Sequence, residues 1–487
     1  MAIIYDDIFD STAKFEAFKY QKEAVDAIKD LEYGAIFHEQ GLGKTKIAID
    51  ILLHWLNNNI DTVFIVTKKT LVLNWVNEFH THTTLTPEVL SSKKGDNYFI
   101  FNSPVRIIVT NFETVSNEKE RIKLFSMTRN IAIIIDESTK IKNPESKLTK
   151  DFFDLAPCFK KRIIMTGTPV ANRPYDIWSQ IFFLDFGHSL GNDFNSFKSD
   201  CDLSNELGYD KNKVSAFEKC VSSIYLKINS FSVRETKNSG IISLPQKNYH
   251  TILVTFETKQ YEMYETLRKE LQLSVIKGDE SILDDSQDAI KRLLRLVQIT
   301  SNPSLVDDAY TLISAKEQKL DELISNILEK GESVIVWSIF TDNIDYFVSK
   351  YKKLGAVKIT GKMNMIDRNR SVNVFKSGEA KILFATPQSA KEGLTLTNAN
   401  HAIFYDRGFN LDDYLQAQDR IHRLSQTKEC HIYNLLVENS IDQWVDMLLY
   451  AKQQAASLAQ GDTSIEEYHS CADYSYAQLI RNILNLS

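Results

Sequence analysis

The sequence has few of the residues that break or crosslink a chain. Its 487 residues include nine prolines, 17 glycines and five cysteines. So few prolines and glycines exclude a collagen-like or linker-rich protein. The cysteines are widely scattered and form no C-x-x-C pair, so neither a zinc ribbon nor a disulfide framework is expected. We expect reduced thiols, as in a protein of the cytoplasm.

Long apolar runs and an excess of basic charge are also missing. No run of about 18 uncharged apolar residues is present, which argues against a membrane span. The first ten residues lack the basic segment and apolar core of a secretory signal. Lys and Arg number 57 against 64 Asp and Glu, a formal net charge of −7. Because a local basic cleft can lie in an acidic protein, this balance neither indicates nor excludes a nucleic-acid partner.

What is present is an alternation of short apolar runs with amphipathic segments, and it occurs twice. The run IAIII at 131–135 is apolar at every position, which suits a strand covered on both faces of a parallel sheet. We therefore predict an α/β fold of two tandem RecA-like, doubly wound lobes with parallel sheets. The expected strands are 33–37, 62–66, 105–110, 131–135 and 162–166 in the first half, and 333–337, 381–385, 401–405 and 430–436 in the second.

The same pattern predicts the domain boundaries. The N-terminal lobe is expected at 1–240, with a polar helical insertion at about 186–232. The C-terminal lobe is expected at 241–450, with a helical insertion at about 258–310, and a helical tail follows at 451–487. A crossover is expected near 244–247, and helices at 316–329 and 411–424.

The sharpest motif is HEQGLGKTKIAIDILL, which follows an expected strand and opens a helical pattern. Its glycines let backbone N–H groups face phosphate oxygens at a helix N-terminus. Lys44 is predicted to reach the β- and γ-phosphates of ATP, and the Thr45 hydroxyl to bind Mg²⁺. The predicted nucleotide-binding residues of this loop are Gly41, Leu42, Gly43, Lys44 and Thr45.

An acidic pair ends the apolar run at 131–135. Carboxylates at the carboxyl edge of a parallel sheet lie where α/β proteins bind ligands. Asp136 is predicted to hold Mg²⁺, and Glu137 to orient and deprotonate the attacking water. An acidic pair alone is often a solvated turn, but the loop about ninety residues upstream favours the catalytic interpretation.

A third motif is QAQDRIHRLSQ at 416–426. Arg420 and Arg423 lie three residues apart, which would place them on one face of a helix. Two guanidinium groups that reach a γ-phosphate would stabilise the charge of the transition state. Alone, such a helix is more often a solvated face, so this interpretation depends on the other two motifs.

The order of these motifs resembles superfamily 2 helicase-type ATPases, and within them the Swi/Snf-like DNA translocases, over about residues 18–436. Phe18-Lys19-Tyr20-Gln21 resembles the adenine-reading motif, with Gln21 as the base contact. IVTKKTLVLNWVNEF resembles the first DNA-contacting motif of the family and includes Trp75. MTGTPVANRPYDIWSQIFFLD resembles the motif that couples hydrolysis to lobe movement.

The resemblance implies roles for further residues. Those implied to couple hydrolysis to movement are Thr166, Gly167, Thr168, Gly393, Thr395 and Gln416, and those implied to contact DNA are Lys68, Lys69, Thr110, Thr360 and Lys391. Departures from the family pattern occur as well. His38 stands in place of the usual aspartate, and Ser138-Thr139 in place of Ala-His, so coupling is expected to run through a hydroxyl.

The expected function is that of an ATP- and Mg²⁺-dependent motor on double-stranded or branched DNA. A helicase or branch-migration enzyme that acts on forks and junctions remains an alternative. So do a binding module that has lost hydrolysis, and the motor subunit of a restriction or defence assembly whose protein partner supplies the target. The compact organisation resembles phage or bacterial members of the family.

Overall fold

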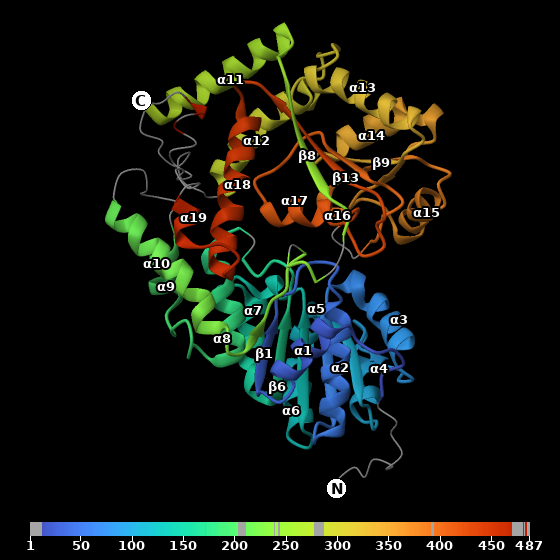
Figure 1. Ribbon diagram of the computed structural model, residues 1–487, viewed down its shortest axis with the longest axis vertical. Helices are drawn as coiled ribbons and strands as arrows, with labels where there is room; N and C mark the ends of the chain where they lie inside the picture. The colour runs from blue at the N-terminus through green and yellow to red at the C-terminus, as the bar shows by residue number, and fades with distance from the viewer. Residues whose placement is uncertain are drawn as a thin grey trace. The chain divides into compact units, whose positions relative to one another are not determined.

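Two parallel β-sheets form the framework of the protein (Figure 1). The computed structural model describes residues 12–170, 172–202, 211–237, 239–241, 244–276, 287–390, 394–469, 481 and 483–484. The chain divides into a first unit of Met1–Cys201, Cys220–Ile242 and Ala459–Gly461, and a second unit of the remaining residues. The predicted fold, two α/β lobes with parallel sheets in tandem, is confirmed.

The first sheet has seven strands in the order β3-β4-β2-β5-β6-β1-β7, and all its pairs are parallel. Its central strands are covered on both faces. Val63 and Ile65 of β2 pack in one cluster with helix α2, whereas Phe64 contacts Phe101 and Phe125 on the opposite face. The strands are β1 (Tyr33–Ile36), β2 (Thr62–Thr67), β3 (Glu88–Val89), β4 (Ile107–Asn111), β5 (Ile131–Asp136), β6 (Phe159–Met165) and β7 (Ser232–Val233).

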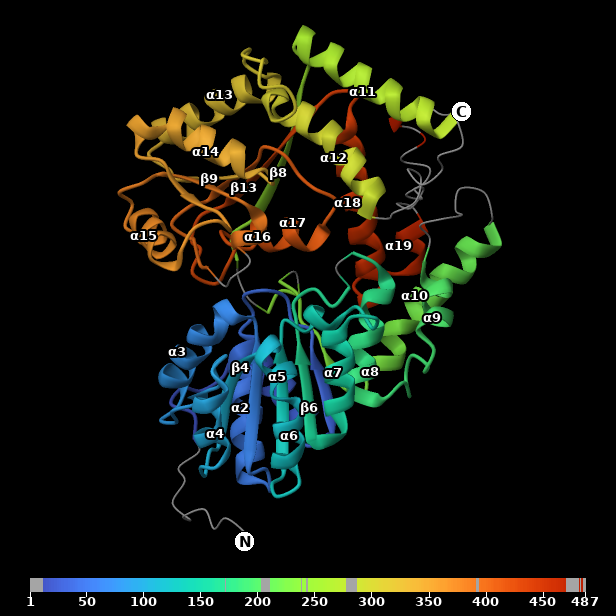
Figure 2. The same cartoon turned by 180° about the vertical axis from the view of Figure 1, so that it is seen from behind.

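Helices connect these strands and lie on both sides of the sheet (Figure 2). Helix α2 carries apolar residues almost throughout, and its Ile47, Ile51 and Trp55 are buried in the cluster that covers one face. The helices of this unit are α1 (Lys19–Ile28), α2 (Lys44–Asn57), α3 (Val72–His82), α4 (Lys94–Phe101), α5 (Phe112–Asn117), α6 (Lys119–Ser126), α7 (Lys147–Leu155), α8 (Trp178–Asp185), α9 (Phe194–Cys201) and α10 (Lys211–Ile228).

The second sheet has six parallel strands in the order β10-β11-β9-β12-β13-β8. Edge strand β8 begins in the segment where the sequence predicted a crossover. Tyr249, Thr251 and Leu253 are exposed while their neighbours are half-buried, so β8 lacks the continuous apolar run of the central strands. The strands are β8 (Lys247–Val254), β9 (Val334–Trp337), β10 (Val357–Ile359), β11 (Ile382–Ala385), β12 (His401–Phe404) and β13 (Cys430–Val437).

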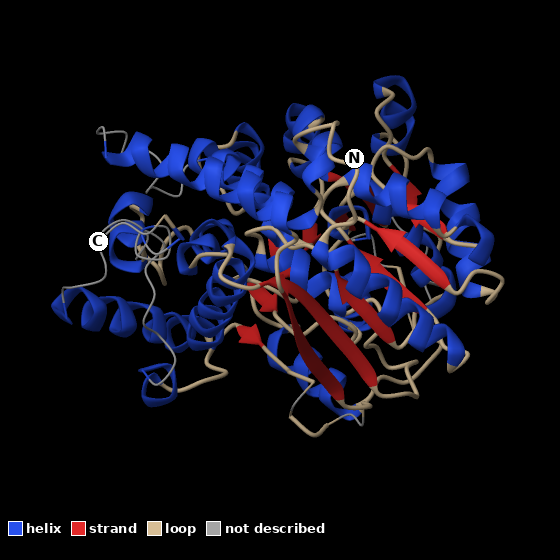
Figure 3. Cartoon of the chain, turned by 90° about the horizontal axis from the view of Figure 1, so that it is seen from above, coloured by secondary structure: helices blue, strands red, loops and turns tan. Residues whose placement is uncertain are grey.

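Helices surround the strands of the second sheet as well (Figure 3). The expected boundary at 450 falls inside one continuous helix, α18. Among the described helices, none is long and apolar enough to cross a membrane. The helices are α11 (Thr258–Ile276), α12 (Gln287–Ser301), α13 (Ala315–Glu329), α14 (Thr341–Lys350), α15 (Met365–Lys376), α16 (Pro387–Ala390), α17 (Leu411–Gln418), α18 (Ile441–Gln460) and α19 (Ile465–His469).

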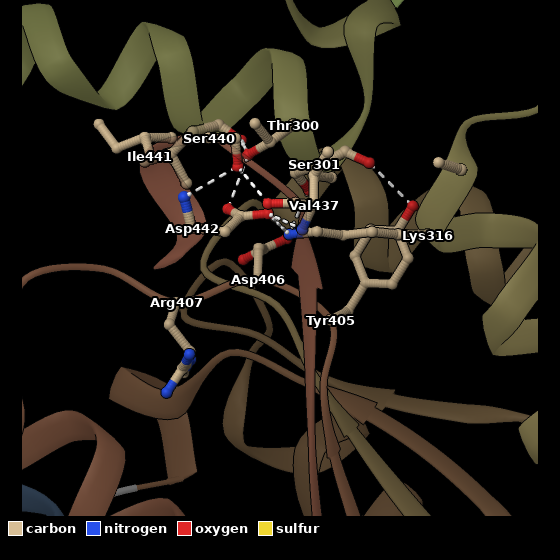
Figure 4. A network of polar contacts seen from close by, with 12 residues as sticks. Thr300, Ser301, Lys316, Tyr405, Asp406, Arg407, Val437, Ser440, Ile441 and Asp442 are labelled. Carbon is tan, nitrogen blue, oxygen red and sulfur yellow. Dashed lines mark hydrogen bonds and ion pairs between the residues drawn. The ribbon is translucent and has the colours of Figure 1, made fainter. Parts of the chain in front are cut away.

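A buried polar network fastens the helical segment α11–α13 to the carboxyl edge of the second sheet (Figure 4). Asp406, two residues after β12, accepts hydrogen bonds from the Ser301 hydroxyl and from the Ser338 hydroxyl. Lys316 at the start of α13 forms an ion pair of 2.6 Å with Asp442 of α18. Burial raises the pKa of Asp406, against the effect of these hydrogen bonds. Because unpaired buried charges are costly, the network fixes how these helices sit on the sheet.

Candidate functional site

The predicted catalytic residues of the first unit meet at one edge of its sheet. Parallel strands end at the same edge, and the loops that follow β1, β2, β5 and β6 carry the motifs predicted from the sequence. Lys44 follows β1, Lys68 follows β2, and Asp136 ends β5. This is the edge at which α/β folds bind ligands.

The loop after β1 has the backbone of a phosphate cradle. Gly41 and Gly43 have φ values of 88° and 71°, in the left-handed region that favours glycine. A Cβ on Gly43 would also lie 2.2 Å from Nε2 of Gln21, so a side chain there would displace the Gln21 amide. Helix α2 begins at Lys44, whose Nζ donates to the carbonyl oxygens of His38 (2.9 Å) and Glu39 (3.2 Å). The helix N-terminus and the ammonium together suit a polyphosphate.

The segment predicted to read adenine lies beside this loop. The Gln21 side chain accepts a hydrogen bond from the Phe18 backbone N–H at 3.0 Å, and its amide nitrogen is 3.5 Å from the carbonyl oxygen of Leu42. The Tyr20 hydroxyl donates to the same carbonyl at 3.1 Å. The Phe18 ring is largely exposed and stacks on Tyr20. Gln21 is therefore held against the loop, with an aromatic surface next to it.

Asp136 is held by two donors from other elements. The Trp75 indole N–H donates to its Oδ2 at 2.8 Å, and the Thr67 hydroxyl donates to the same oxygen at 3.1 Å. Burial and the adjacent Glu137 charge raise the pKa of Asp136 to about 6, against the opposing effects of Trp75, Lys44 and Thr67. The sequence placed Trp75 in a DNA-contacting motif and missed its contact with Asp136, because that contact depends on how α3 packs beside β5.

Glu137 has an unusual backbone conformation. Its φ of 57° is in the left-handed region, which non-glycine residues seldom adopt. Such strained residues concentrate at functional sites. Its side chain is buried between two groups: the Gln40 amide donates to Oε1 at 3.3 Å, and Lys68 Nζ lies 3.6 Å from Oε2. The contact with Gln40, a residue of the loop after β1, was not predicted.

The motif predicted to couple hydrolysis to movement lies against the phosphate loop. A Cβ on Gly167 would come within 3.0 Å of Gln40 Cγ and 3.2 Å of Lys44 Nζ. Thr166 is fully buried, and its hydroxyl oxygen accepts from the Thr168 N–H at 3.2 Å. The three predicted residues 166–168 therefore contact or adjoin the loop that holds Lys44.

A hydroxyl connects the acidic pair to this motif. Ser138, which follows Glu137, donates its hydroxyl proton to Gln180 Oε1 at 2.7 Å. The Gln180 amide in turn donates to the carbonyl oxygen of Pro169 at 2.9 Å. The sequence predicted that the hydroxyl takes part in coupling. It did not predict that Gln180 connects the hydroxyl to Pro169, because Gln180 lies on α8, far from Ser138 in the sequence.

The residues predicted to contact DNA are in different environments. Lys68 is half-buried and Lys69 exposed, both just after β2. Thr110 has 0% exposure and Thr360 has 5%, so neither side chain is accessible to a phosphate in this structure. Their contact with DNA stays a prediction. Lys391 and the coupling residue Gly393 lie outside the described residues.

The arginine motif of the second unit differs from its prediction. Helix α17 ends at Gln418, so Arg420 and Arg423 lie in the following turn and do not share a helix face. The Gln426 side chain stabilises the turn that follows: its amide donates to the carbonyl oxygen of Ile421 at 2.9 Å, and its oxygen accepts from the backbone N–H groups of residues 427 and 428. These bonds satisfy backbone groups outside the helix.

Within this turn the two arginines have different partners. Arg420 is 1% exposed, and its guanidinium donates to the carbonyl oxygens of Gln416 (3.0 Å) and Leu394 (3.4 Å). Arg423 donates to the Thr395 hydroxyl at 2.8 Å. Gln416 is buried, its side-chain amide donates to Asp412 at 2.7 Å, and its side-chain oxygen Oε1 has no hydrogen-bond partner among the described residues. The structure thus brings Arg423 together with Thr395, and Arg420 with Gln416.

His38 gives this site a pH dependence. Burial and the nearby Lys44 charge lower its pKa to about 4. An unfolded histidine takes up its proton near pH 6.5, so folding stability is lost as the pH falls from about 6.5 towards 4. We expect His38 to contribute a loss of about 2 kcal/mol between pH 7 and pH 5. Unfolding curves at both pH values should show a smaller loss for His38→Gln, and an equal loss in both proteins would contradict the assignment.

Comparisons with known proteins agree with this geometry. The family model "SNF2-related domain" matches residues 20–305, and "Helicase conserved C-terminal domain" matches residues 315–425. An "Uncharacterized ATP-dependent helicase" of Mycoplasma pneumoniae is 27% identical over 95% of this chain and 43% of its own length. The "ISWI chromatin-remodeling complex ATPase ISW1" of Saccharomyces cerevisiae is 24% identical over 92% of this chain and 40% of its own length.

The chain thus spans less than half the length of these relatives. Among solved structures, a Sulfolobus solfataricus SWI2/SNF2 ATPase core in complex with dsDNA matches 95% of this chain and 98% of its own, with 23% identity and a TM-score of 0.43. The SNF2-related model alone accounts for more than half of the 487 residues. The chain therefore belongs to the SNF2-related family of helicase-type ATPases.

Proposed function

We propose that the chain is an ATP-driven motor that translocates on double-stranded DNA and thereby remodels DNA or protein–DNA complexes. One observation carries the proposal: a single sheet edge gathers the Lys44 ammonium, the Asp136 carboxylate and the Glu137 carboxylate. A site of this composition suits phosphoryl transfer, which depends on positioning and on charge neutralisation. The relatives named above, an ATP-dependent helicase and a chromatin-remodelling ATPase, support the choice.

The residues present fit ATP with Mg²⁺. Hard oxygen ligands such as the Thr45 hydroxyl and the Asp136 carboxylate are the ones that Mg²⁺ prefers. Glu137 Oε2 is buried and has no hydrogen-bond donor within the described part of the chain, so it can accept a proton or a hydrogen bond. When bound, Mg²⁺ would neutralise charge on the β- and γ-phosphates. We propose Gly41, Leu42, Gly43 and Lys44 as the cradle, and Gln21 as the adenine contact.

The chain's own residues would then have distinct tasks. The Lys44 ammonium, held at the carbonyl oxygens of His38 and Glu39, would transfer to the phosphates. Glu137 would orient a water molecule and accept its proton. Thr166, Gly167 and Thr168, which lie against the loop, would transmit the state of the site to the rest of the unit.

DNA contacts are proposed through the backbone of the duplex. Lys68 and Lys69 follow β2 at the same sheet edge and can pair with phosphates. Phosphate contacts position a protein without reading sequence. Because the whole chain carries a net charge of −7, the DNA path must be a local basic surface. Affinity should fall with salt, with a slope of about −0.9 per neutralised phosphate.

Duplex DNA is expected to stimulate ATP hydrolysis at least as well as single strands do. The reason is that a motor which tracks phosphates needs no strand separation. ATPase rates should be measured with duplex, single-stranded, forked and four-way-junction DNA, and with RNA as control. On a triplex substrate, we expect the third strand to be displaced while a blunt duplex stays paired.

The alternatives give other patterns in these assays. Added migration of a four-way junction would identify a branch-migration enzyme. Efficient unwinding of blunt duplex, or stimulation by RNA alone, would contradict the proposal and favour a conventional helicase.

A further inference from the structure

The predicted general base forms an ion pair with a predicted DNA contact. Lys68 Nζ lies 3.6 Å from Oε2 of Glu137, the carboxylate oxygen that has no hydrogen-bond donor within the described residues. The other oxygen, Oε1, accepts from the Gln40 amide at 3.3 Å. The Glu137 carboxylate is thus held on one side by the phosphate loop and on the other by Lys68.

Strand register explains why these two residues meet. β2 and β5 are adjacent and parallel, and Val66 pairs with Ile135. The residues that follow therefore lie opposite each other in succession. The Thr67 hydroxyl donates to Asp136 at 3.1 Å, and Lys68 pairs with Glu137. The end of β2 holds both carboxylates through neighbouring side chains.

The ion pair opposes the role proposed for Glu137. While the Lys68 ammonium lies at Oε2, this oxygen is not open to a water molecule whose proton it would accept. The same ammonium cannot be fully committed to a DNA phosphate while it neutralises Glu137. The Lys68 side chain is 24% exposed, whereas the Glu137 side chain is 9% exposed. A pair with one partly exposed member is weak enough for a phosphate to compete.

We propose that Lys68 makes ATP hydrolysis respond to DNA: a DNA phosphate that binds Lys68 draws it off Glu137 and frees the carboxylate to accept a proton from water. This inference rests on the proposed function, because it needs both a DNA phosphate and an ATP-hydrolysing site. Gln40 keeps its contact with Oε1 when Lys68 leaves, so Glu137 stays positioned. The left-handed backbone at Glu137 holds the same side chain in place.

Binding linkage provides a test that does not depend on hydrolysis. If Lys68 is shared between Glu137 and DNA, removal of the Glu137 charge must release Lys68 and tighten DNA binding. Duplex affinity is measured without nucleotide, by anisotropy of a labelled duplex, for the wild type, Glu137→Gln, Lys68→Met and the double variant. We expect Glu137→Gln to tighten binding about three- to fivefold in the wild-type background and by less than about 1.5-fold with Lys68→Met.

Lys69 supplies the matched control. It is the next residue, is also a proposed DNA contact, and is exposed. Lys69→Met should weaken duplex binding but keep the full gain from Glu137→Gln. A gain of equal size in the Lys68→Met and Lys69→Met backgrounds would show a general loss of negative charge and would overturn the inference.

Hydrolysis gives the second readout. Without DNA, Lys68→Met should raise the ATPase rate about three- to tenfold, and saturating duplex should stimulate it by a correspondingly smaller factor. Lys68→Arg keeps the charge and should restore both the low basal rate and the stimulation. A basal rate of Lys68→Met at or below that of the wild type would overturn the inference. Failure of the wild type to bind duplex would instead contradict the proposed function itself.

Discussion

In duplex-stimulated assays, Glu137→Gln is expected to hydrolyse ATP about 10²–10⁴-fold more slowly than the wild type while still binding the nucleotide. The amide keeps the size of the side chain and can still meet Gln40, but it cannot accept a proton. The variant should therefore trap ATP, and filter binding with radiolabelled ATP should show wild-type affinity.

Lys44→Ala is expected to lose ATP binding, the step before hydrolysis. Its ammonium donates to the carbonyl oxygens of His38 and Glu39 in the loop after β1. Without it the phosphates lose their main neutralising side chain, so productive ATP binding should be lost.

A lysine two residues further on is the control for that variant. Lys46 belongs to the same helix but forms an ion pair with Asp50 at 2.5 Å, away from the loop. Lys46→Ala should keep ATP binding and most of the turnover. If Lys44→Ala and Glu137→Gln both hydrolyse ATP at the wild-type rate, the site has been assigned to the wrong residues.

Much of the fold could be predicted from the sequence because its central strands carry a local signal. A strand such as β5 is covered on both faces, so its residues 131–135 are all apolar and stand out from amphipathic helices. Edge strand β8 lacks that signal, since its residues alternate between exposed and half-buried. The end of α17 was also missed, because the turn after it is held by side-chain bonds of Gln426 to backbone groups, which the helical spacing does not reveal.

The candidate site likewise has features that the local sequence predicts and contacts that it does not. The glycines of the phosphate loop lie close together in the sequence, and so do the two residues of the acidic pair. Each motif can therefore be recognised from its local pattern. Contacts between distant elements depend on packing and register. Trp75 reaches Asp136, and Ser138 reaches Gln180, across separate helices and strands. For Thr110, the family resemblance implied a DNA contact, and the motif did not reveal that packing buries this side chain completely.

Arg423→Ala is expected to reduce ATP turnover by about 10³-fold or more, with a smaller change in nucleotide affinity. The resemblance to helicase-type ATPases implies that this guanidinium stabilises charge on the γ-phosphate of ATP. Arg423 donates to the side-chain hydroxyl of Thr395 and to the backbone carbonyl oxygen of Asp419, and these contacts set its position. Arg423→Lys keeps a charge but loses the planar fork, and most of the loss should remain.

Arg420→Ala should also reduce ATP turnover, and it should lower the stability of the fold as well. Arg420 is buried, and its guanidinium satisfies the carbonyl oxygens of Gln416 and Leu394. Alanine leaves these acceptors without a donor, at about 1–3 kcal/mol for a buried group, so the melting temperature should fall as well. Turnover, ATP affinity, DNA affinity and thermal unfolding should be measured on both variants. Loss of DNA affinity with intact basal turnover would assign the arginine concerned to DNA binding, and wild-type values in all four would exclude it from the site.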